Sequence, residues 1–245
     1  MLRTVITCVD YAEELRLCLP HNRQHFSEVM IVTSSKDADN VWPVAEANRA
    51  SLCVTDAFYQ HGAHFAKYAA LEYALDQFGR HGWLCLCDAD VIWPKDVRID
   101  LKPGFLYGPY RRMCPSVPEE VPAEHNWANF PRHWNTNEIA GYTQIFHADD
   151  PALGLPPWHD ISWIGAQGGD SFFQQKWPKD KRVRLGWDVL HVGEPARNWH
   201  GRVSAFQDGS APPEAAGRAY SLAQAMYDRR KKPDPTFRSE RTAKP

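Results

Sequence analysis

Long apolar stretches are missing from this sequence, because no run approaches the ~18 residues that a membrane-spanning helix needs. Residues 1–6 lead directly into a strand-like segment, without the basic region, apolar region and cleavage site of a secretory leader. The chain has only six cysteines among 245 residues, and none of them stands at zinc-site spacing. We therefore expect a cytoplasmic globular protein, in which the four cysteines that lie in apolar strand-like runs are small core residues.

An excess of charge is also missing. The net charge is −2, so nothing attracts the chain as a whole to a polyanion such as nucleic acid. The C-terminal residues 197–245 differ from the rest, since they carry ten Lys/Arg and five Asp/Glu. This end of the chain either meets a polyanion or is simply solvated, as most charge runs are. We expect a basic, partly flexible helix or tail over 203–245.

Apolar runs separated by helix-like segments dominate the first hundred residues. Strands are predicted at 4–9, 29–33, 51–55 and 83–87, with helices from residue 10 onward and over 63–78. Strands that alternate with helices predict an α/β domain with a mainly parallel sheet. In such sheets ligands bind at the carboxyl ends of the strands, which is where Asp10, Ser34 and Asp88 are expected.

The pattern changes after residue 100. Six prolines within 103–135 predict a long loop or a pair of short strands, one of them at 105–107. Further along, we expect a strand at 142–147, a short helix at 171–176 and a last strand at 187–191.

Two carboxylates one residue apart, Asp88 and Asp90, follow the apolar run 83–87. Aspartates are rarely left buried unless they are paired or bound to a metal. Mg²⁺ and Mn²⁺ are held by one or two carboxylates, while water and substrate phosphate oxygens complete the shell. Asp pairs also occur in plain turns, but this D-x-D pair at a strand end predicts a divalent-metal site for a nucleotide diphosphate.

Three further side chains have both a ligand-binding and a structural interpretation. Lys67, near the start of the 63–78 helix, either reaches a pyrophosphate or lies along the surface. Asp10 either hydrogen-bonds a nucleoside or caps the following helix, in which Glu13 has capping-box spacing. Asp170, after two glycines, either accepts a proton from an acceptor hydroxyl or caps a short helix.

The segment from His191 to Arg202 is the second dense group of polar residues. The imidazole of His191, or that of His200, suits Mn²⁺ as a third ligand beside two carboxylates. Arg197 and Arg202 are suited to neutralising phosphate charge. Ten tryptophans offer ring faces for stacking on sugars or bases, and some of them belong to the core.

Taken in order, these motifs resemble the metal-dependent glycosyltransferases of the GT-A fold. The resemblance spans about residues 3–202 and rests on four segments: Cys-Val-Asp at 8–10, Lys67 ahead of Ala-Ala-Leu-Glu-Tyr-Ala at 69–74, Cys-Leu-Cys-Asp-Ala-Asp at 85–90, and Gly-Gly-Asp-Ser-Phe-Phe at 168–173. It implies a single Rossmann-like domain over 1–202 with a mainly parallel mixed sheet. Within it, 1–100 would be the nucleotide-sugar half and 101–202 a loop-rich acceptor half.

The resemblance also implies ligands and roles. The donor would be a nucleotide-sugar, a UDP-sugar above others, bound through Mn²⁺ or Mg²⁺. Asp90 would be the direct metal ligand, Asp88 would contact ribose or metal, and His191 would match the C-terminal histidine ligand of some members. Asp170 would be the base of inverting members, although this chain has Gly-Gly-Asp where the family has Glu-Asp.

Two other functions compete with sugar transfer to a hydroxyl. A nucleotidyltransferase also uses paired carboxylates and Mg²⁺, but a glycine-rich phosphate loop after the first strand would favour it, and residues 9–19 contain no glycine. A non-catalytic sugar- or nucleic-acid-binding module explains the tryptophans and the basic tail without the aspartates. For the transferase, the sequence leaves the acceptor open among a saccharide, a lipid-linked glycan, a protein and a modified nucleic-acid base.

Overall fold

The computed structural model describes residues 1–63, 65–133, 138–163, 165–166 and 169–193. In this part of the chain, strands form one sheet in the order β3-β2-β1-β4-β7-β6-β8-β5. The strands are β1 (Leu2–Thr7), β2 (Glu28–Thr33), β3 (Ser51–Val54), β4 (Trp83–Asp88), β5 (Val91–Ile92), β6 (Leu106–Cys114), β7 (Thr143–His147) and β8 (Arg182–Val192). The α-helices are α1 (Ala12–Asn22), α2 (Ala38–Ala47), α3 (Lys67–Phe78) and α4 (Gly169–Phe173).

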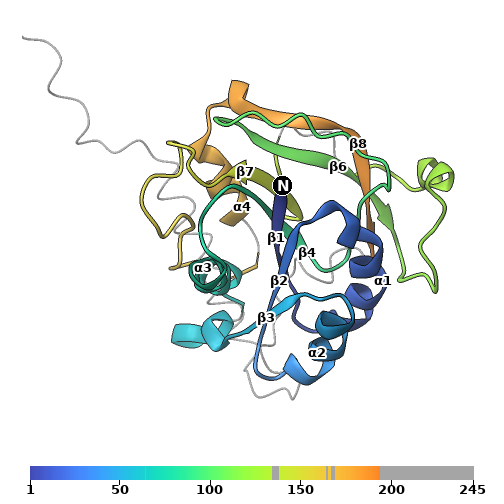
Figure 1. Cartoon of the computed structure of the whole chain (residues 1–245), viewed down its shortest axis with the longest axis horizontal. Coiled ribbons are helices and arrows are strands. Elements are labelled where there is room, and N and C mark those ends of the chain that lie inside the picture. Colours follow the sequence, from blue (N-terminus) through green and yellow to red (C-terminus); the bar gives the residue numbers. More distant parts are fainter. Residues whose placement is uncertain (64, 134–137, 164, 167–168, 194–245) are drawn as a thin grey trace, which may run out of the picture.

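The direction of the strands defines one functional edge of the sheet. β1 pairs in parallel with β2 and with β4, and β2 pairs in parallel with β3, so the carboxyl ends of these four strands lie together (Figure 1). β7 is antiparallel to β4, which brings the beginning of β7 to the same edge. β6 and β8 are parallel to each other, and β5 pairs antiparallel with the end of β8. This mixed, mainly parallel sheet confirms the predicted α/β class.

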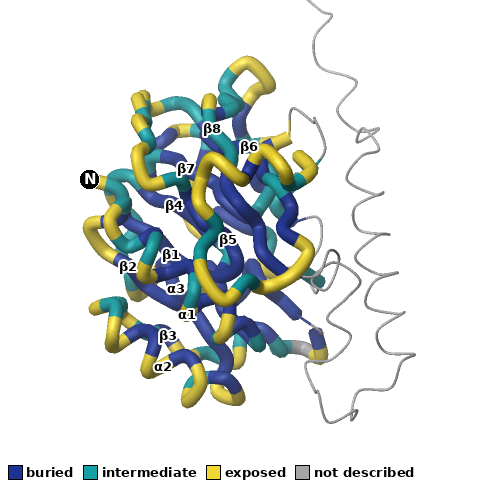
Figure 2. The backbone as a smooth tube through the Cα atoms, turned by 90° about the vertical axis from the view of Figure 1, so that its right-hand side faces the viewer, coloured by how far each residue is buried: buried dark blue, intermediate teal, exposed yellow. Residues whose placement is uncertain are grey.

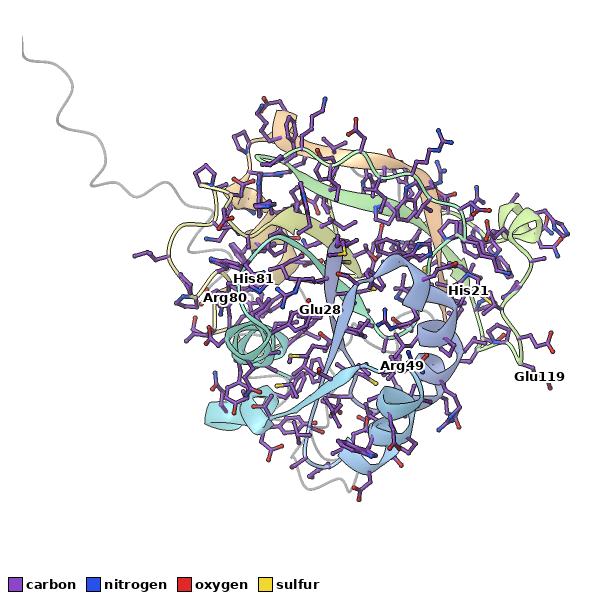
Figure 3. All side chains as sticks on the ribbon, viewed as in Figure 1. His21, Glu28, Arg49, Arg80, His81 and Glu119 are labelled. Atoms are coloured by element: carbon purple, nitrogen blue, oxygen red, sulfur yellow. The ribbon has the colours of Figure 1, made fainter. Side chains whose placement is uncertain are left out.

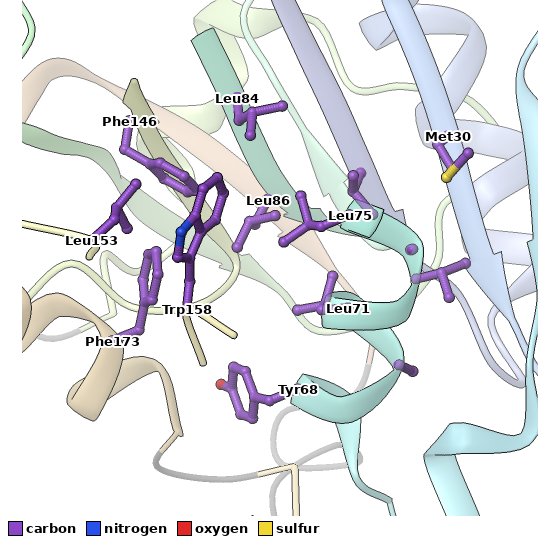
Figure 4. Close-up of a cluster of buried hydrophobic side chains, with 14 of the residues drawn as sticks. Met30, Tyr68, Leu71, Leu75, Leu84, Leu86, Phe146, Leu153, Trp158 and Phe173 are labelled. Atoms are coloured by element: carbon purple, nitrogen blue, oxygen red, sulfur yellow. The ribbon is translucent and has the colours of Figure 1, made fainter. Parts of the chain in front are cut away.

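Helices cover both faces of the central strands, which explains why those strands are mostly apolar. Successive side chains point to opposite faces: Val5 and Leu86 pack with α3, whereas Ile6 and Cys85 pack with α1 and α2. Figure 1 shows α3 apart from α1 and α2, and Figure 2 shows the central strands as the buried interior. In Figure 4, Leu71 of α3 lies beside Leu86 of β4.

The cysteines confirm one expectation from composition. All six are buried and carry free thiols. Burial raises the pKa of the Cys18 and Cys85 thiols well above the usual value, so both stay protonated as small core residues. Separately, no helix among the described residues has the length and apolar character needed to cross a bilayer.

The structure contradicts the helix-capping interpretation of Asp10. Tyr11, not Asp10, occupies the N-cap position of α1, and no side chain caps this helix. Asp10 has a φ of 58°, in the left-handed region that Asp tolerates better than most residues. Its backbone N–H donates to Asp37 Oδ2 at 2.7 Å. Capping by Asp10 is therefore wrong, and α1 also continues through Pro20, which lies in its last turn.

Three elements are longer than predicted or were not predicted at all, and prolines in the sequence explain two of these differences. α2 lies where no element was predicted, since Pro43 inside it interrupts the helical pattern. β6 extends from the predicted 105–107 strand through Pro109, where the pairing register with β8 shifts between Gly108 and Tyr110. Such an irregularity tolerates a residue without an N–H. β8 begins at Arg182 instead of 187.

Candidate active site

The D-x-D pair lies at the carboxyl edge of the sheet, as predicted. Asp88 is the last residue of β4, and Asp90 precedes β5. Because Val91 of β5 pairs with His191 of β8, Asp90 is brought to the end of β8, where its carbonyl oxygen accepts the N–H of Val192 at 2.9 Å. Asp90 is 1% exposed, and its Oδ2 lies 3.5 Å from His191 Nε2. The structure therefore brings Asp90 and His191 together from positions a hundred residues apart.

Lys67 and Asp88 form an ion pair. Lys67 is the first residue of α3. The helix begins at the carboxyl edge of the sheet, so Lys67 lies near the end of β4. Lys67 is buried along most of its length, whereas a quarter of the Asp88 side chain stays exposed. The pair explains how a lysine is tolerated at a helix N-terminus, where the helix dipole opposes its charge.

His191 is held in its neutral form. Burial, and next the positive charge of Arg111, lower the pKa of the His191 imidazole to about 3, against the opposing charge of Asp88. A neutral imidazole offers a lone pair, which is the form that binds metals. Its Nδ1 atom is buried and has no hydrogen-bond partner among the described residues.

Arg111 is a site residue that sequence reasoning missed. It lies on β6 and is 4% exposed. Its guanidinium lies 4.8 Å from the ring centroid of Tyr142, and Nη2 lies 3.1 Å from His133 Nδ1. The neighbouring Arg112 instead pairs with Asp188, at 2.6 Å. Adjacent arginines on one strand point to opposite faces, so the pair Arg111–Arg112 would indicate one inward-facing arginine if the segment were known to be a strand. The prolines of the segment instead predicted a loop.

Three carboxylates act on the guanidinium of Arg111. Burial lowers the pKa of Arg111 below its usual value, while the charges of Tyr142, Asp88, Asp90 and Asp170 all raise it. The carboxylates of β4, of the β4–β5 turn and of α4 are therefore all within electrostatic reach of one buried cation. Arg111 and Lys67 together offset this negative charge.

Asp170 is held against the loop that precedes β7. It lies in the first turn of α4, its Oδ2 accepts the N–H of Gly141 at 2.7 Å, and its Oδ1 accepts the N–H of Ser171 at 2.8 Å. Burial raises the pKa of the Tyr68 phenol, and the charges of Asp170 and Asp88 raise it further. Tyr68 is therefore within electrostatic reach of both Asp170 and Asp88.

Gly169 allows α4 to approach Tyr68 closely. A Cβ atom at this position would lie 2.1 Å from the Tyr68 ring. We expect Gly169→Ala to destabilise the fold by about 1–3 kcal/mol, because the ring or the helix must move. Chemical denaturation measures the change. Gly186→Ala is the matched control, since a Cβ there meets nothing within 4 Å; equal stability of the two variants would contradict this packing.

The side-chain oxygen and nitrogen atoms at this site are of the types that bind a divalent cation. They do not by themselves form a complete coordination shell. Within the described residues, no group of three or more His, Cys, Asp or Glu side chains is arranged to hold a metal ion. Asp90 and His191 supply an oxygen and a nitrogen 3.5 Å apart, a donor pair that suits Mn²⁺. Asp88 is paired with Lys67 through Oδ1, so its Oδ2 atom would be the oxygen to offer a third ligand.

The remaining predicted residues have different outcomes. Asp10 follows β1 at the carboxyl edge, next to Asp37, whose Oδ1 accepts the side-chain N–H of Asn40 at 3.0 Å. Arg197, Arg202 and the alternative ligand His200 lie outside the described residues, as does the basic tail.

Comparisons with known proteins add information about the fold. No family model matches the sequence, and no curated protein matches it. Among solved structures, the chain is similar to glucosyl-3-phosphoglycerate synthase from Mycobacterium tuberculosis in complex with Mg²⁺ and UDP, at 10% identity and a TM-score of 0.50, over 96% of this chain and 81% of that one. A second structure of that synthase, with Mn²⁺, UDP-glucose and phosphoglyceric acid, gives the same four values. With the strand order above, this likeness shows that the chain has a Rossmann-like GT-A fold, an α/β domain built on one mixed, mainly parallel sheet.

Proposed function

We propose that this protein is a glycosyltransferase, which moves a sugar from a nucleotide-diphosphate sugar to an acceptor hydroxyl. The observation that carries this proposal is the charge arrangement at the carboxyl edge of the sheet, where parallel sheets bind their ligands. Asp88, Asp90 and His191 lie there beside two buried cations, Lys67 and Arg111. The proposed metal ligands thus lie next to two cationic side chains that can neutralise the charge of a diphosphate.

The proposed metal ligands are Asp90 and His191, with Asp88 as a third ligand or a contact to ribose. When bound, Mn²⁺ or Mg²⁺ would supply Lewis-acid neutralisation of the diphosphate oxygens. His191 is neutral near pH 7, since its pKa is about 3, so no proton has to leave it before it binds a cation.

The chain's own charged groups have separate proposed roles. Lys67 and Arg111 stabilise negative charge on the leaving diphosphate, in a buried setting where such stabilisation is strong. Asp170 accepts the proton of the acceptor hydroxyl. Asp10 contacts the nucleoside at the end of β1, and Arg197 with Arg202 adds positive charge.

Metal-dependent binding of the donor is the first test. We expect UDP-glucose to raise the melting temperature when Mn²⁺ is present and to lose this effect when a chelator is added. Saturation at a hundred times Kd stabilises by about 2.7 kcal/mol, or roughly 5–10 °C for a chain of this length. UDP-glucose and Mn²⁺ are the first probes because one of the structures above holds them.

The other outcomes of that experiment identify the competing functions. Stabilisation by nucleoside triphosphates with Mg²⁺, and by no nucleotide-sugar, would favour a nucleotidyltransferase. Stabilisation by free sugar or DNA alone would favour a non-catalytic module. A hydrolysis screen of nucleotide-sugars then identifies the donor, because many transferases slowly hydrolyse their own donor, and the acceptor search begins with saccharides.

A further inference from the structure

A pocket beside the loop 157–160 has no role in the proposed donor site. Its volume is about 410 Å³, within the range of small-molecule sites. One wall is formed by the loop from Pro157 to Asp160, and the other by the end of α4 and the 3-10 turn η4 (Gln174–Lys176).

The lining combines ring faces with hydrogen-bonding groups. Trp158 and Phe172 contribute aromatic rings, and Asp160, Gln175 and Lys176 contribute polar ends. Trp158 is fixed in the core by an edge-to-face contact with Phe146, at 5.8 Å between ring centroids, and both residues are labelled in Figure 4. A pyranose ring has an apolar face of C–H groups and a rim of hydroxyls, so this mixed lining suits one sugar ring better than a wholly apolar ligand.

A buried carboxylate fixes the pocket wall from behind. Glu72 of α3 accepts the backbone N–H groups of Trp158 at 3.0 Å and His159 at 2.9 Å, and it pairs with Arg80 at 2.8 Å. Arg80 is labelled beside α3 in Figure 3. Burial alone would raise the pKa of the Glu72 carboxyl, but hydrogen bonds from His159 and the charge of Arg80 lower it below its usual value. Glu72 is thus a charged anchor for the loop.

The same carboxylate sets the tautomer of His159. The Nδ1 atom of His159 lies 2.5 Å from Glu72 Oε1 and therefore donates its proton there. Burial lowers the pKa of this imidazole, so the ring is neutral and its Nε2 atom carries a lone pair. This Nε2 atom is buried and has no hydrogen-bond partner among the described residues. His159 is one of the residues that line the pocket, and a buried acceptor without a donor is suited to a ligand hydroxyl.

The pocket adjoins the candidate active site through one aromatic ring. His159 stacks between Phe173, at 4.2 Å, and Tyr68, at 5.3 Å between ring centroids. Tyr68 is in turn within electrostatic reach of Asp170 and Asp88. The rings of His159 and Tyr68 therefore connect the pocket wall to the candidate active site.

We propose that this pocket binds one ring of a saccharide, with the ring face on Phe172 and one hydroxyl donating to His159 Nε2. Saccharide binding itself does not require the proposed transfer reaction. That the bound saccharide is the acceptor of transfer does rest on the proposed function.

Saturation-transfer NMR and calorimetry on the full chain test the pocket, with methyl glycosides of glucose, galactose, mannose and N-acetylglucosamine as probes. We expect at least one glycoside to bind. Phe172→Ala removes one wall and His159→Phe keeps the stacked ring but removes the acceptor, so each should weaken binding by about tenfold or more. Tyr73→Ala, which removes an exposed aromatic of α3, should change affinity by less than about twofold.

Failure of this inference is distinguishable from failure of the proposed function. If no glycoside binds the wild-type protein, or if both pocket variants bind like wild type, the pocket is not a saccharide site, whatever UDP-glucose and Mn²⁺ do. If His159→Phe does not fold, Phe172→Ala alone decides. If the variants lose glycoside binding and the wild-type protein does not bind nucleotide-sugars with Mn²⁺, the saccharide site is supported and the proposed transferase function is wrong.

Discussion

Asp90→Ala is expected to abolish the stabilisation that UDP-sugars give in the presence of Mn²⁺ and to lower sugar transfer more than about 100-fold. Loss of even an outer partner of a metal ligand costs 10–100-fold at known metal sites, and Asp90 is proposed as a direct ligand. The carboxylate is 1% exposed beside a neutral imidazole, an environment that disfavours a bare charge and favours one bound to a cation.

The Asp90 experiment needs folding to be measured separately from binding. The backbone hydrogen bond from Val192 to the Asp90 carbonyl does not involve the side chain, so β5 and β8 should stay paired in the variant. Asp90→Asn preserves the shape and should show the same loss of metal-dependent binding, whereas the exposed Asp96→Asn should behave like wild type. Transfer at the wild-type rate by Asp90→Ala in the presence of chelator would overturn the proposed metal site.

Asp170→Asn is expected to leave donor binding in place and to lower kcat by about 10²–10⁴-fold, the usual contribution of a general base. The carboxylate accepts N–H groups from Gly141 and Ser171 on its two oxygens. An amide has only one acceptor oxygen, so one of these bonds is lost at a cost of about 1 kcal/mol. The melting temperature with and without UDP-glucose and Mn²⁺ separates this structural effect from the effect on turnover.

Steady-state kinetics distinguish a base from a residue that only positions the loop before β7. If Asp170 takes the proton, Asp170→Asn should lower kcat without raising KM for the donor or the acceptor. Asp149→Asn is the control, because that side chain is 79% exposed. Loss of donor binding with an unchanged chemical step would instead assign Asp170 to the donor site.

The elements that could be predicted are those that local pattern determines. β1, β2 and β4 are predictable because strands covered on both faces are mostly apolar, whereas β3, an exposed edge strand, is predictable only from its short Leu-Cys-Val run. The end of β4 then places Asp88 at the ligand-binding edge. α3 is predictable from its helical spacing, and with it the position of Lys67 near the same edge.

What could not be predicted depends on pairing between distant segments. The ligand chemistry of His191 predicts that it lies beside the carboxylates, but the pairing of β5 with β8 that brings it to Asp90 follows from nothing local in a two-residue strand. Arg111 is recognisable as a site residue only once β6 is known to lie between β7 and β8. Similarly, the tautomer of His159 follows from Glu72, which lies 87 residues earlier in the chain.

The antiparallel pairing of β7 with β4 makes the two parts of the chain inseparable. A polypeptide ending near residue 100 would leave one side of Trp83–Asp88 without its backbone partners, and β5 without β8. An uncovered apolar strand is a template for pairing with another molecule. Residues 1–100, the proposed nucleotide-sugar half, are thus not expected to form a stable domain alone: we expect them to stay monodisperse only while the later strands, which carry His191, complete the sheet.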